Sequence, residues 1–527
     1  MKYSFDEFNS SSLLVRSYIN KKENVLKYAG AFFDEDTLLK QCNVKEFSKE
    51  KRTLLSDRLL AQNSKIKLST KSAGNIKKIV DNKTFTITTG HQLNMATGPL
   101  YTLYKILEVI NWCEKLNEKQ GENYFVPVFW MATEDHDFEE IKHVNLFGSK
   151  IDWQHSDAEN TVVGRLNTDP ICSFIEQVLS KFNDDELRKK IALFLSTYSE
   201  AKTLASANRN LINNLFGNYG LVIIDGDDSE LKKAFIPTVK LEIQQGLTYT
   251  EVSATDKKLL SDGFHSQVYV RESNLFYIDS TGERIRIEKS GNNFAMNSKI
   301  FSKSELLALL DECPERFSPN ALLRPIYQES ILPNVCYVGG GGEIAYWLQL
   351  KSTFEQINLQ FPILKVRESV ILLNGKLVQQ LNDFDYTVLD LKAHIDDVLK
   401  DFVTKNQTIE LSLADQKTDL EKLKNDVLEK ALAIDRNSSS FVAAEFQRME
   451  NQLEKIEKKF IATEKKNQEK SLKQIRRLQN SFFPNGSFQE RYENYMTYMH
   501  HEDFIGKIKG DLKKRMTAKA AIQLLRI

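Results

Sequence analysis

The chain has 527 residues, enough for two or three domains with at least one substantial core. Its 72 basic and 72 acidic residues balance, which argues against a general attraction to nucleic acid or to an anionic membrane. The start, MKYSFDEF, lacks the basic and apolar stretches of a signal peptide, and no apolar run is long enough to predict a membrane span. The five cysteines are dispersed without CxxC spacing, which is typical of reduced thiols. We therefore expect a cytoplasmic protein without a metal site.

The first part of the chain alternates between helical and strand patterns. Residues 1–80 read as mostly helical. TFTIT (84–88) then predicts a short strand, and a helix follows from about Leu100 to Glu118. The next segment, YFVPVFWMAT (124–133), is an almost unbroken apolar run of strand length. Such a run is typical of a central parallel strand that is covered on both faces.

Two later segments repeat this design of an apolar strand followed by a polar, glycine-bearing turn. They are YGLVIIDGDD (219–228) and NVCYVGGGGEIAYWLQLKSTF (334–354). Strands that alternate with helices in this way predict an α/β fold with a Rossmann-like, doubly wound parallel sheet. Residues 262–290 differ, because their apolar residues alternate with period two around an STGE turn. This pattern predicts an antiparallel insertion.

The composition changes after about residue 375, where charged residues dominate and glycine and proline become rare. Apolar residues recur at steps of three and four near 420–434 and again near 446–460, on either side of the polar segment DRNSSS (435–440). This spacing is the seam of a coiled coil, and the break predicts an antiparallel helical hairpin used for packing or dimerisation.

These patterns predict two domains. The first, residues 1–375, is a Rossmann-like core with a helical N-terminal segment and the antiparallel insertion. The second, residues 376–527, is a helical coiled-coil domain whose final segment, about 481–527, packs back on the core.

A first candidate binding loop is TTGHQLNMATGPLYTLYK (88–105), between the first strand and its helix. In open α/β sheets, ligands bind outside the carboxyl ends of the strands, and glycine lets the backbone approach them closely. The stretch matches neither GxGxxG nor the P-loop consensus, and a purely structural turn is the alternative. The candidate residues are Gly90, His91, Gln92, Thr97, Gly98 and Lys105.

A second candidate is EDHDFEEIKH (134–143), directly after the apolar strand. Consecutive ionisable residues are costly near a core unless they have a purpose. Asp135, His136 and Asp137 could perform acid–base work, or bind a metal or an amine. Glu139 and Glu140 fit better at a helix N-terminus, where acidic residues complement the helix dipole.

A third candidate is GGGGE (339–343), which opens a predicted helix. Each glycine lowers stability by about 0.5–1 kcal/mol relative to alanine in regular structure. Four glycines in a row therefore indicate that another group comes close to the backbone. That group is an anion or a substrate amide, with Glu343 as a partner for an amine. Close packing of helix against strand is the alternative. The residues are Gly339, Gly340, Gly341, Gly342 and Glu343.

Five ordered stretches together resemble the BshC family, the cysteine-adding enzymes of bacillithiol biosynthesis. They are TTGHQ…TGPLYTLYK, VPVFWMATEDHDFEEI, FSPNALLRPIYQESILPNVCYVGGGGEIAYW, FPILKVRES and FFPNGSFQER. The resemblance runs from about residue 84 to the FFPNG element. The sequence departs from the family at two points: His91 stands where relatives often have Gln, and the third glycine of GGGGE where they often have Pro.

The resemblance implies a Rossmann-like core related to the class I synthetase group, inserted connecting segments, and a C-terminal coiled coil used in dimerisation. It also implies the last step of the pathway, in which cysteine is joined by an amide to the amine of glucosaminyl-malate. ATP or ADP is the cofactor that it suggests. The alternatives are a nucleotidyl transferase acting on another small metabolite and a coiled-coil scaffold without catalysis.

On this resemblance, Asp135, His136 or Asp137 would orient and deprotonate the amine, and His91 is a further candidate for proton transfer. The glycine-bearing loops would hold carboxylate or phosphate groups through backbone amides. Candidates for binding malate, from LLRPIYQE and KVRES, are Arg324, Gln328 and Arg367, since guanidinium matches carboxylate bidentately. A core ion pair is the alternative for the arginines. We expect the three clusters to converge around one cleft at the strand ends.

Overall fold

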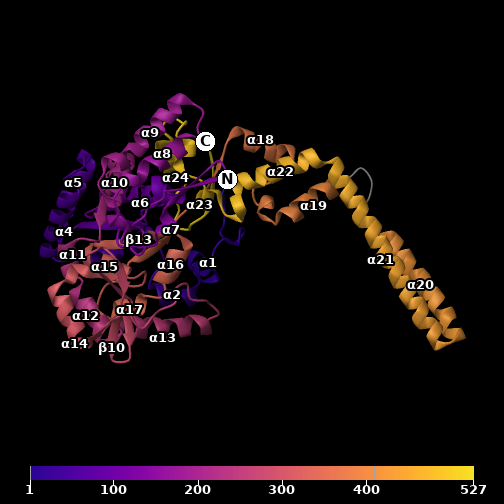
Figure 1. Cartoon of the computed structure of the whole chain (residues 1–527), viewed down its shortest axis with the longest axis horizontal. Coiled ribbons are helices and arrows are strands. Elements are labelled where there is room, and N and C mark those ends of the chain that lie inside the picture. Colours follow the sequence, from indigo (N-terminus) through magenta and orange to yellow (C-terminus); the bar gives the residue numbers. More distant parts are fainter. Residues whose placement is uncertain (1, 407–410) are drawn as a thin grey trace. The chain divides into compact units, whose positions relative to one another are not determined.

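The computed structural model describes residues 2–406 and 411–527 (Figure 1). The chain divides into two compact units. The first comprises Met1–Leu372 and Glu490–Ile527, and the second comprises Leu373–Gln489. Within the described ranges, no helix combines the length and the apolar character that crossing a membrane requires.

The N-terminal region of the first unit is helical, as its sequence predicts. After the short strand β1 (Lys2–Tyr3), its helices are α1 (Leu13–Ile19), α2 (Glu23–Ala29), α3 (Glu35–Val44), α4 (Lys49–Gln62) and α5 (Thr70–Lys78). Side chains of Ser12, Asp34, Ser48 and Ser69 accept backbone hydrogen bonds at four of the helix starts. Arg52 of α4 is buried and donates to the carbonyl oxygens of Ile79, Asp81 and Thr84, which fixes this region to the start of the sheet.

A five-stranded sheet lies at the centre of the first unit, in the order β14-β13-β2-β3-β6. Every neighbouring pair in it is parallel, which confirms the predicted parallel sheet. The strands are β2 (Thr84–His91), β3 (Tyr124–Met131), β6 (Val222–Asp225), β13 (Asn334–Gly339) and β14 (Ile363–Val366). The chain builds outward from β2 through β3 to β6 and then returns to the other side of β2. The switch point of the sheet therefore lies between β2 and β13, where open α/β sheets hold their ligands.

The helix α6 (Tyr101–Asn117) and the strand β3 form the centre of the hydrophobic core. Leu103 and Leu107 of α6 belong to one core cluster, whereas Val109 and Trp112 belong to another. All residues of β3 after Tyr124 are buried. Because successive side chains of a strand point to opposite faces, this burial means that both faces of the sheet are covered at β3.

The remaining elements of the first unit connect these strands or close the unit. Between β3 and β6 lie α7 (Phe138–Ile141), β4 (His143–Leu146), β5 (Ser149–Asp152), α8 (Cys172–Leu179), α9 (Asp185–Glu200) and α10 (Leu204–Phe216). Between β6 and the insertion lie α11 (Ser229–Lys233), α12 (Ile236–Gln245) and α13 (Leu247–Ser261). The helix α14 (Lys303–Glu312) lies within the insertion, before its last strand. Between the insertion and β14 lie α15 (Arg324–Ile331), α16 (Gly341–Trp347) and α17 (Lys351–Gln356).

The insertion consists of two small antiparallel sheets. One has the order β12-β7-β8 and the other β11-β10-β9. Their strands are β7 (Leu275–Ile278), β8 (Arg284–Arg286), β9 (Glu288–Ser290), β10 (Asn293–Met296), β11 (Lys299–Ser302) and β12 (Phe317–Pro319). The STGE turn joins β7 to β8.

The C-terminal segment of the first unit returns to its beginning. It contains α24 (Phe504–Arg515) and β16 (Ile522–Arg526), and α23 (Gln489–Tyr492) begins at the division between the units. The strand β16 lies between β1 and β15 (Ser369–Leu373) in a three-stranded sheet and pairs antiparallel with β1. The first and last strands of the chain are therefore direct neighbours.

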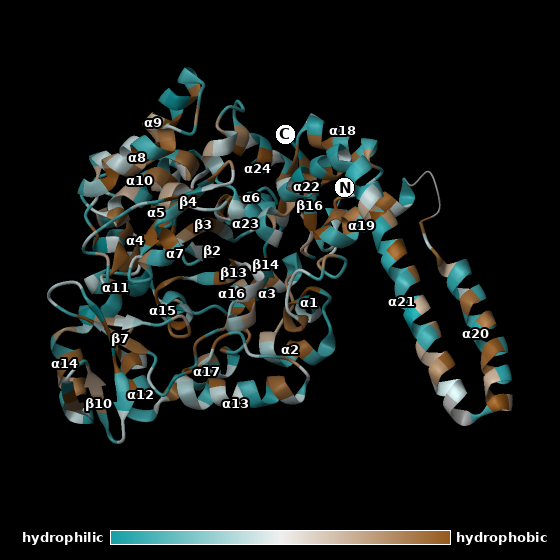
Figure 2. Cartoon of the chain, turned by 45° about the vertical axis from the view of Figure 1, so that its right-hand side comes forward, coloured by the Kyte–Doolittle hydropathy of each residue, from teal (hydrophilic) through white to brown (hydrophobic). Residues whose placement is uncertain are grey.

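The second unit is helical. It contains α18 (Gly375–Asp383), α19 (Ile395–Lys405), α20 (Ala414–Ile434), α21 (Arg436–Asn467) and α22 (Glu469–Phe482). The helices α20 and α21 lie side by side (Figures 1 and 2), and Lys417 near the start of α20 forms a 2.7 Å ion pair with Glu457 in the second half of α21. The helical character predicted for this region is confirmed, whereas its assignment as a coiled coil stays a prediction.

The break between these two helices is shorter than the sequence predicts. Only Asp435 separates them, and α21 begins at Arg436. Asp435 is extended, with φ −166° and ψ 165°, and its side chain accepts a 3.0 Å hydrogen bond from the Ser438 amide. The polar residues of DRNSSS therefore cap and start a helix and do not form a loop.

Candidate functional site

A cavity of about 610 Å³ opens at the carboxyl ends of β2, β3 and β13, within the first unit. This volume falls in the range of about 300–1,000 Å³ that is usual for small-molecule sites. The sequence-predicted residues that line it are Gly90, His91, Gln92, Asp135, Arg324, Gly340, Gly342, Glu343 and Arg367. The predicted residues outside its lining are Thr97, Gly98, Lys105, His136, Asp137, Gln328, Gly339 and Gly341.

An acid–amide cluster forms one wall of the cavity. The Gln92 side-chain amide donates to Asp135 Oδ2 at 2.8 Å and to Glu140 Oε2 at 2.9 Å. Arg284 NH1 lies 3.5 Å from Asp135 Oδ1. Burial raises the pKa of the Asp135 carboxyl. Hydrogen bonding from His136 and the charge of Arg284 outweigh this effect and hold the pKa well below its usual range. Asp135 therefore stays ionised and presents a carboxylate to the cavity.

His136 lies beside this cluster and does not line the cavity. Its Nδ1 is 3.1 Å from Arg284 NH1 and 3.6 Å from Asp135 Oδ1. The same Nδ1 atom therefore faces a donor, the Arg284 guanidinium, and an acceptor, the Asp135 carboxylate, and the tautomer decides which of the two it bonds. In either tautomer His136 Nδ1 is engaged within the cluster. Asp137 is also outside the lining, and its Oδ1 accepts from the Glu140 amide at the start of α7.

A buried ion pair joins the two strands at the switch point. Lys105 Nζ donates to the carbonyl oxygen of Gly90 at 2.5 Å and to Glu343 Oε2 at 2.6 Å. The Tyr337 hydroxyl and the Gly340 amide also donate to the Glu343 carboxylate, at 2.7 and 2.9 Å. Burial raises the pKa of the Glu343 carboxyl, but the charge and hydrogen bond of Lys105 outweigh burial and lower this pKa to about 2. Lys105 thus links the end of β2 to the start of α16. Because the Gly340 amide already donates to Glu343, it is not free to bind a substrate.

The four glycines of GGGGE have two different surroundings. A Cβ on Gly339 would lie 3.0 Å from Tyr337 Cε1, and one on Gly341 would lie 2.9 Å from Ser11 Oγ. A Cβ on Gly340 or Gly342, both of which line the cavity, would meet nothing closer than 3.6 Å. Close packing therefore accounts for Gly339 and Gly341, whereas Gly340 and Gly342 keep the cavity wall free of side chains.

His91 lines the cavity at the end of β2. Burial, followed by the charge of Lys105, lowers its pKa to about 3. The imidazole is therefore neutral near pH 7. Its ring packs edge-on against Tyr101, with the centroids 5.2 Å apart, and within the described chain its buried Nε2 has no hydrogen-bond partner. Because the ring resists protonation, His91 is suited to hydrogen bonding and not to acid catalysis near neutral pH.

The turn around Thr97 and Gly98 is structural, which corrects the expectation that these residues lie at the cleft. Thr97 is buried, and Gly98 has a φ of +67° that favours glycine. A Cβ at Gly98 would lie 2.6 Å from the Cβ of Asn94. The Asn494 side-chain amide donates to the carbonyl oxygens of Ala96 and Gly98, at 2.9 and 2.8 Å. The C-terminal segment therefore holds this turn, and the parts of the predicted loop that reach the cavity are residues 90–92 and Tyr101.

All three predicted malate-binding residues already have partners within the protein. Arg367 is buried and donates to both carboxylate oxygens of Glu490, at 3.0 and 2.7 Å, which is the core ion pair considered as its alternative. Arg324 lines the cavity, and its guanidinium donates to Gln328 Oε1 at 2.9 Å and to the Tyr346 hydroxyl at 3.3 Å. Gln328 does not line the cavity itself, but it positions Arg324 through this hydrogen bond.

Sequence reasoning missed four cavity arginines, which are Arg271, Arg284, Arg286 and Arg491. Three of them come from the antiparallel insertion. Arg284 and Arg286 are two apart on β8, and residues two apart share one face of a strand. Both guanidinium groups stack on Phe276, at 4.0 and 4.5 Å from its ring centroid. The segment GERIRIE contains a sequence signal for two of them, because its alternating pattern places Arg284 and Arg286 on one face of a strand.

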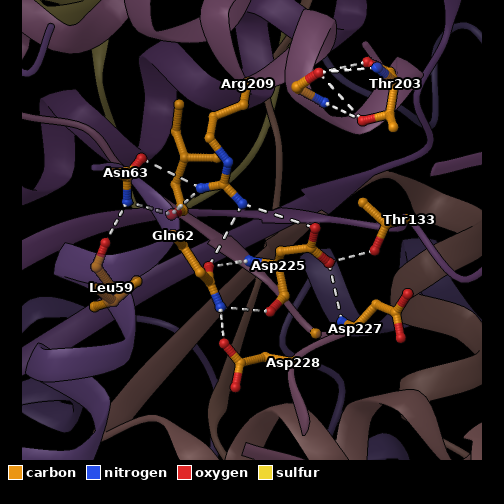
Figure 3. Close-up of polar contacts among 12 residues, drawn as sticks. Leu59, Gln62, Asn63, Thr133, Thr203, Arg209, Asp225, Asp227 and Asp228 are labelled. Atoms are coloured by element: carbon orange, nitrogen blue, oxygen red, sulfur yellow. Dashed lines mark hydrogen bonds and ion pairs between the residues drawn. The ribbon is translucent and has the colours of Figure 1, made fainter. Parts of the chain in front are cut away.

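A second polar network supports the cavity from the end of β6 (Figure 3). Thr133, which lines the cavity, donates from its hydroxyl to Asp225, and Gln62 both accepts from the Asp225 amide and donates to its carbonyl oxygen. Burial raises the pKa of the Asp225 carboxyl. Lys232 lies 2.6 Å from the carboxylate of Glu134, another lining residue. This network fixes the backbone after β3 through contacts with residues of and after β6.

Comparisons with known proteins find relatives over most of the chain. The family model described as "Bacillithiol biosynthesis BshC, N-terminal Rossmann-like domain" matches residues 1–368. The model described as "Bacillithiol biosynthesis BshC, C-terminal coiled-coil domain" matches residues 370–522.

Three curated relatives carry the name "Putative cysteine ligase BshC". The protein of Flavobacterium johnsoniae is 40% identical over 495 residues, which is 92% of each chain. The protein of Flavobacterium psychrophilum is 40% identical over 519 residues, which is 97% of this chain and 96% of the relative. The protein of Christiangramia forsetii is 37% identical over 519 residues, with the same coverage.

Proposed function

Because the chain belongs to the BshC family of bacillithiol biosynthesis, we propose that it is a ligase that joins cysteine to glucosaminyl-malate through an amide bond. The observation that carries this proposal is the cavity at the switch point, where an ionised carboxylate cluster and several arginines face one space. An amine substrate that also bears carboxylates needs both kinds of group. We take cysteine as the second substrate because the relatives are named as cysteine ligases.

Asp135 is the residue we assign to the amine of the acceptor. Its low pKa keeps it charged, so it attracts an ammonium group and accepts hydrogen bonds from an amine. The same low pKa makes it a weak base, so its main contribution is to hold the nitrogen in position for attack. Gln92 fixes the carboxylate by its hydrogen bond to Oδ2.

The neutral imidazole of His91 is the residue we assign to hydrogen bonding of the reacting carboxyl group. It lines the cavity next to Gly90, and its buried Nε2 is without a partner in the described part of the chain. If Nε2 carries the ring proton, it can donate to a developing oxyanion without a change of charge. This role needs no proton transfer from His91, in agreement with its pKa of about 3.

The family resemblance also suggests ATP or ADP. The cavity arginines are of the residue type that fits phosphate groups, and a bound ATP would activate the cysteine carboxylate. This chain's own residues bind the substrates, orient the amine and exclude water. We also propose a cytoplasmic location, and a homodimer formed through the exposed apolar faces of α20 and α21.

The proposal is tested by incubating the full-length protein with cysteine, glucosaminyl-malate and ATP, and by measuring the amide product by mass spectrometry. The expected result is one product that depends on all three. Transfer of a nucleotidyl group to the acceptor without an amide would favour the nucleotidyl transferase. In a deletion strain, bacillithiol should disappear and glucosaminyl-malate should accumulate. An unchanged thiol pool there would contradict the proposal.

A further inference from the structure

Two arginines of the antiparallel insertion line the cavity without a partner. Arg271 precedes β7 and is exposed, and Arg286 ends β8 and is partly buried. In residues 2–406 and 411–527, neither side chain forms an ion pair within 4.0 Å or a hydrogen bond. Arg286 is instead held by its stacking on the ring of Phe276, at 4.5 Å from the centroid.

The other cavity arginines contrast with this pair. Arg284 donates to the carbonyl oxygen of Pro319 at 2.7 Å and to Ser318 Oγ at 3.2 Å, while Arg324 and Arg367 have the acceptors described above. Arg491 stacks over Tyr101, 5.8 Å from its centroid, and not on Phe276. Within the described residues, the protein thus supplies acceptors for Arg284, Arg324 and Arg367, whereas Arg271, Arg286 and Arg491 have none. Of these three, Arg271 and Arg286 both come from the insertion.

Arg271 and Arg286 are also close enough to repel each other. Burial lowers the pKa of the Arg286 guanidinium, and the charge of Arg271 lowers it further, which Glu288 opposes. Two neighbouring cations without hydrogen-bond acceptors at the cavity favour the binding of an anion, because the anion relieves the repulsion and provides acceptors for several N–H donors at once.

We propose that Arg271 and Arg286 bind the anionic end of a substrate, as a specificity site separate from the Asp135 cluster. The inference rests on the proposed function and names the group recognised, which is a carboxylate of the malate half or a phosphate of a nucleotide. A dicarboxylate fits the pair well, since each guanidinium can hold one carboxylate through two parallel hydrogen bonds. Replacing malate by a neutral group should therefore abolish recognition.

The test measures the binding of L-malate, and separately of ATP, to the full-length protein by calorimetry. The variants are Arg271→Gln, Arg286→Gln and the double variant. Lys289→Gln is the matched control, because Lys289 is an exposed cation of the same insertion that does not line the cavity. Each arginine variant should weaken malate binding about tenfold or more, which corresponds to the loss of one charge-assisted contact of about 1.4 kcal/mol or more.

The outcomes separate the two anion sources. Loss of malate affinity assigns the pair to the carboxylates, and loss of ATP affinity alone assigns it to phosphate. Arg286→Lys keeps the charge but not the planar fork, so it should recover only part of the affinity. Unchanged affinity for both probes in the double variant, with an unchanged melting temperature, would overturn the proposal. An equal loss in Lys289→Gln would also overturn it.

A product assay distinguishes failure of this inference from failure of the proposed function. If the wild-type protein forms the amide and the double variant keeps its KM for glucosaminyl-malate, the anion site fails alone. If the wild-type protein forms no amide and malate binding still depends on both arginines, the proposed function fails and the anion site stands.

Discussion

The two units of this protein depart from the usual distribution of polar and apolar residues in opposite ways. At the strand ends of the first unit, charged side chains such as Lys105 are buried, with Glu343 as partner. In the second unit, large apolar side chains are exposed, and Phe441 and Ile434 keep 66% and 77% of their surface accessible. Figure 2 shows apolar residues along both α20 and α21. Buried charge and exposed apolar surface both cost stability, so each marks a place where binding is expected to compensate.

Breaking the buried ion pair should produce the largest effect. Lys105→Met leaves the Glu343 carboxylate buried without its cation, and removal of one partner of a buried pair costs about 3–5 kcal/mol. Urea denaturation should therefore show a clearly reduced free energy of unfolding. The double variant Lys105→Met with Glu343→Leu removes both charges and should recover part of the loss. A single variant as stable as the wild type would mean that the pair is not formed.

Neutralising the carboxylate that faces the cavity should affect turnover more than folding, although Asp135 is also the ion-pair partner of the buried Arg284. Asp135→Asn keeps the shape of the side chain but loses the charge that holds the amine in position, and kcat should fall about 100-fold. Glu140→Gln is the control, since Glu140 shares the Gln92 amide but is assigned no role with the amine. Equal activities of the two variants would remove Asp135 from the site.

The exposed apolar surface of the second unit should control association. Ile434→Glu with Phe441→Glu places charges on the surface of α20 and α21, and sedimentation should show a dimer weakened by about tenfold or more. Leu193→Glu is the control, because Leu193 is 75% exposed on the first unit. A variant that remains fully dimeric would place the subunit contact elsewhere.

A smaller effect concerns pH and the buried carboxyl of Glu493. Burial raises its pKa to about 7, although the Tyr498 hydroxyl opposes the shift. The folded state then binds a proton more tightly than the unfolded state, so stability should fall as pH rises from about 4.5 to about 7 and stay lower above it. Glu493→Gln removes this dependence and should be more stable than the wild type at pH 8. Equal pH profiles of unfolding would contradict the assignment.

The sheet and the position of the cavity could be predicted because their signals are local. The β-branched stretch at 84–88 and the apolar run at 124–133 identify strands. The strand ends then identify the ligand edge without knowledge of any partner. The family was recognisable from five ordered motifs, and the comparisons confirm it.

The parts that could not be predicted depend on distant residues. Gly98 belongs to a structural turn because Asn494, 396 residues later, holds its carbonyl oxygen. Arg367 is occupied because Glu490 lies against it, and nothing near KVRES in the sequence reveals that pairing. The insertion arginines were missed for another reason. The period-two pattern places Arg284 and Arg286 on a strand, but it does not show that this strand lies at the cavity.

The pairing of β1 with β16 has a consequence for synthesis on the ribosome. The second unit interrupts the first, so residues 1–372 emerge long before residues 490–527. Until then, Arg367 lacks Glu490, the turn at Gly98 lacks Asn494, and β1 lacks its neighbour. A chain that stops before residue 490 therefore lacks three contacts that complete the first unit, one of them to a cavity arginine. The first unit becomes complete only after residues 490–527 have been made.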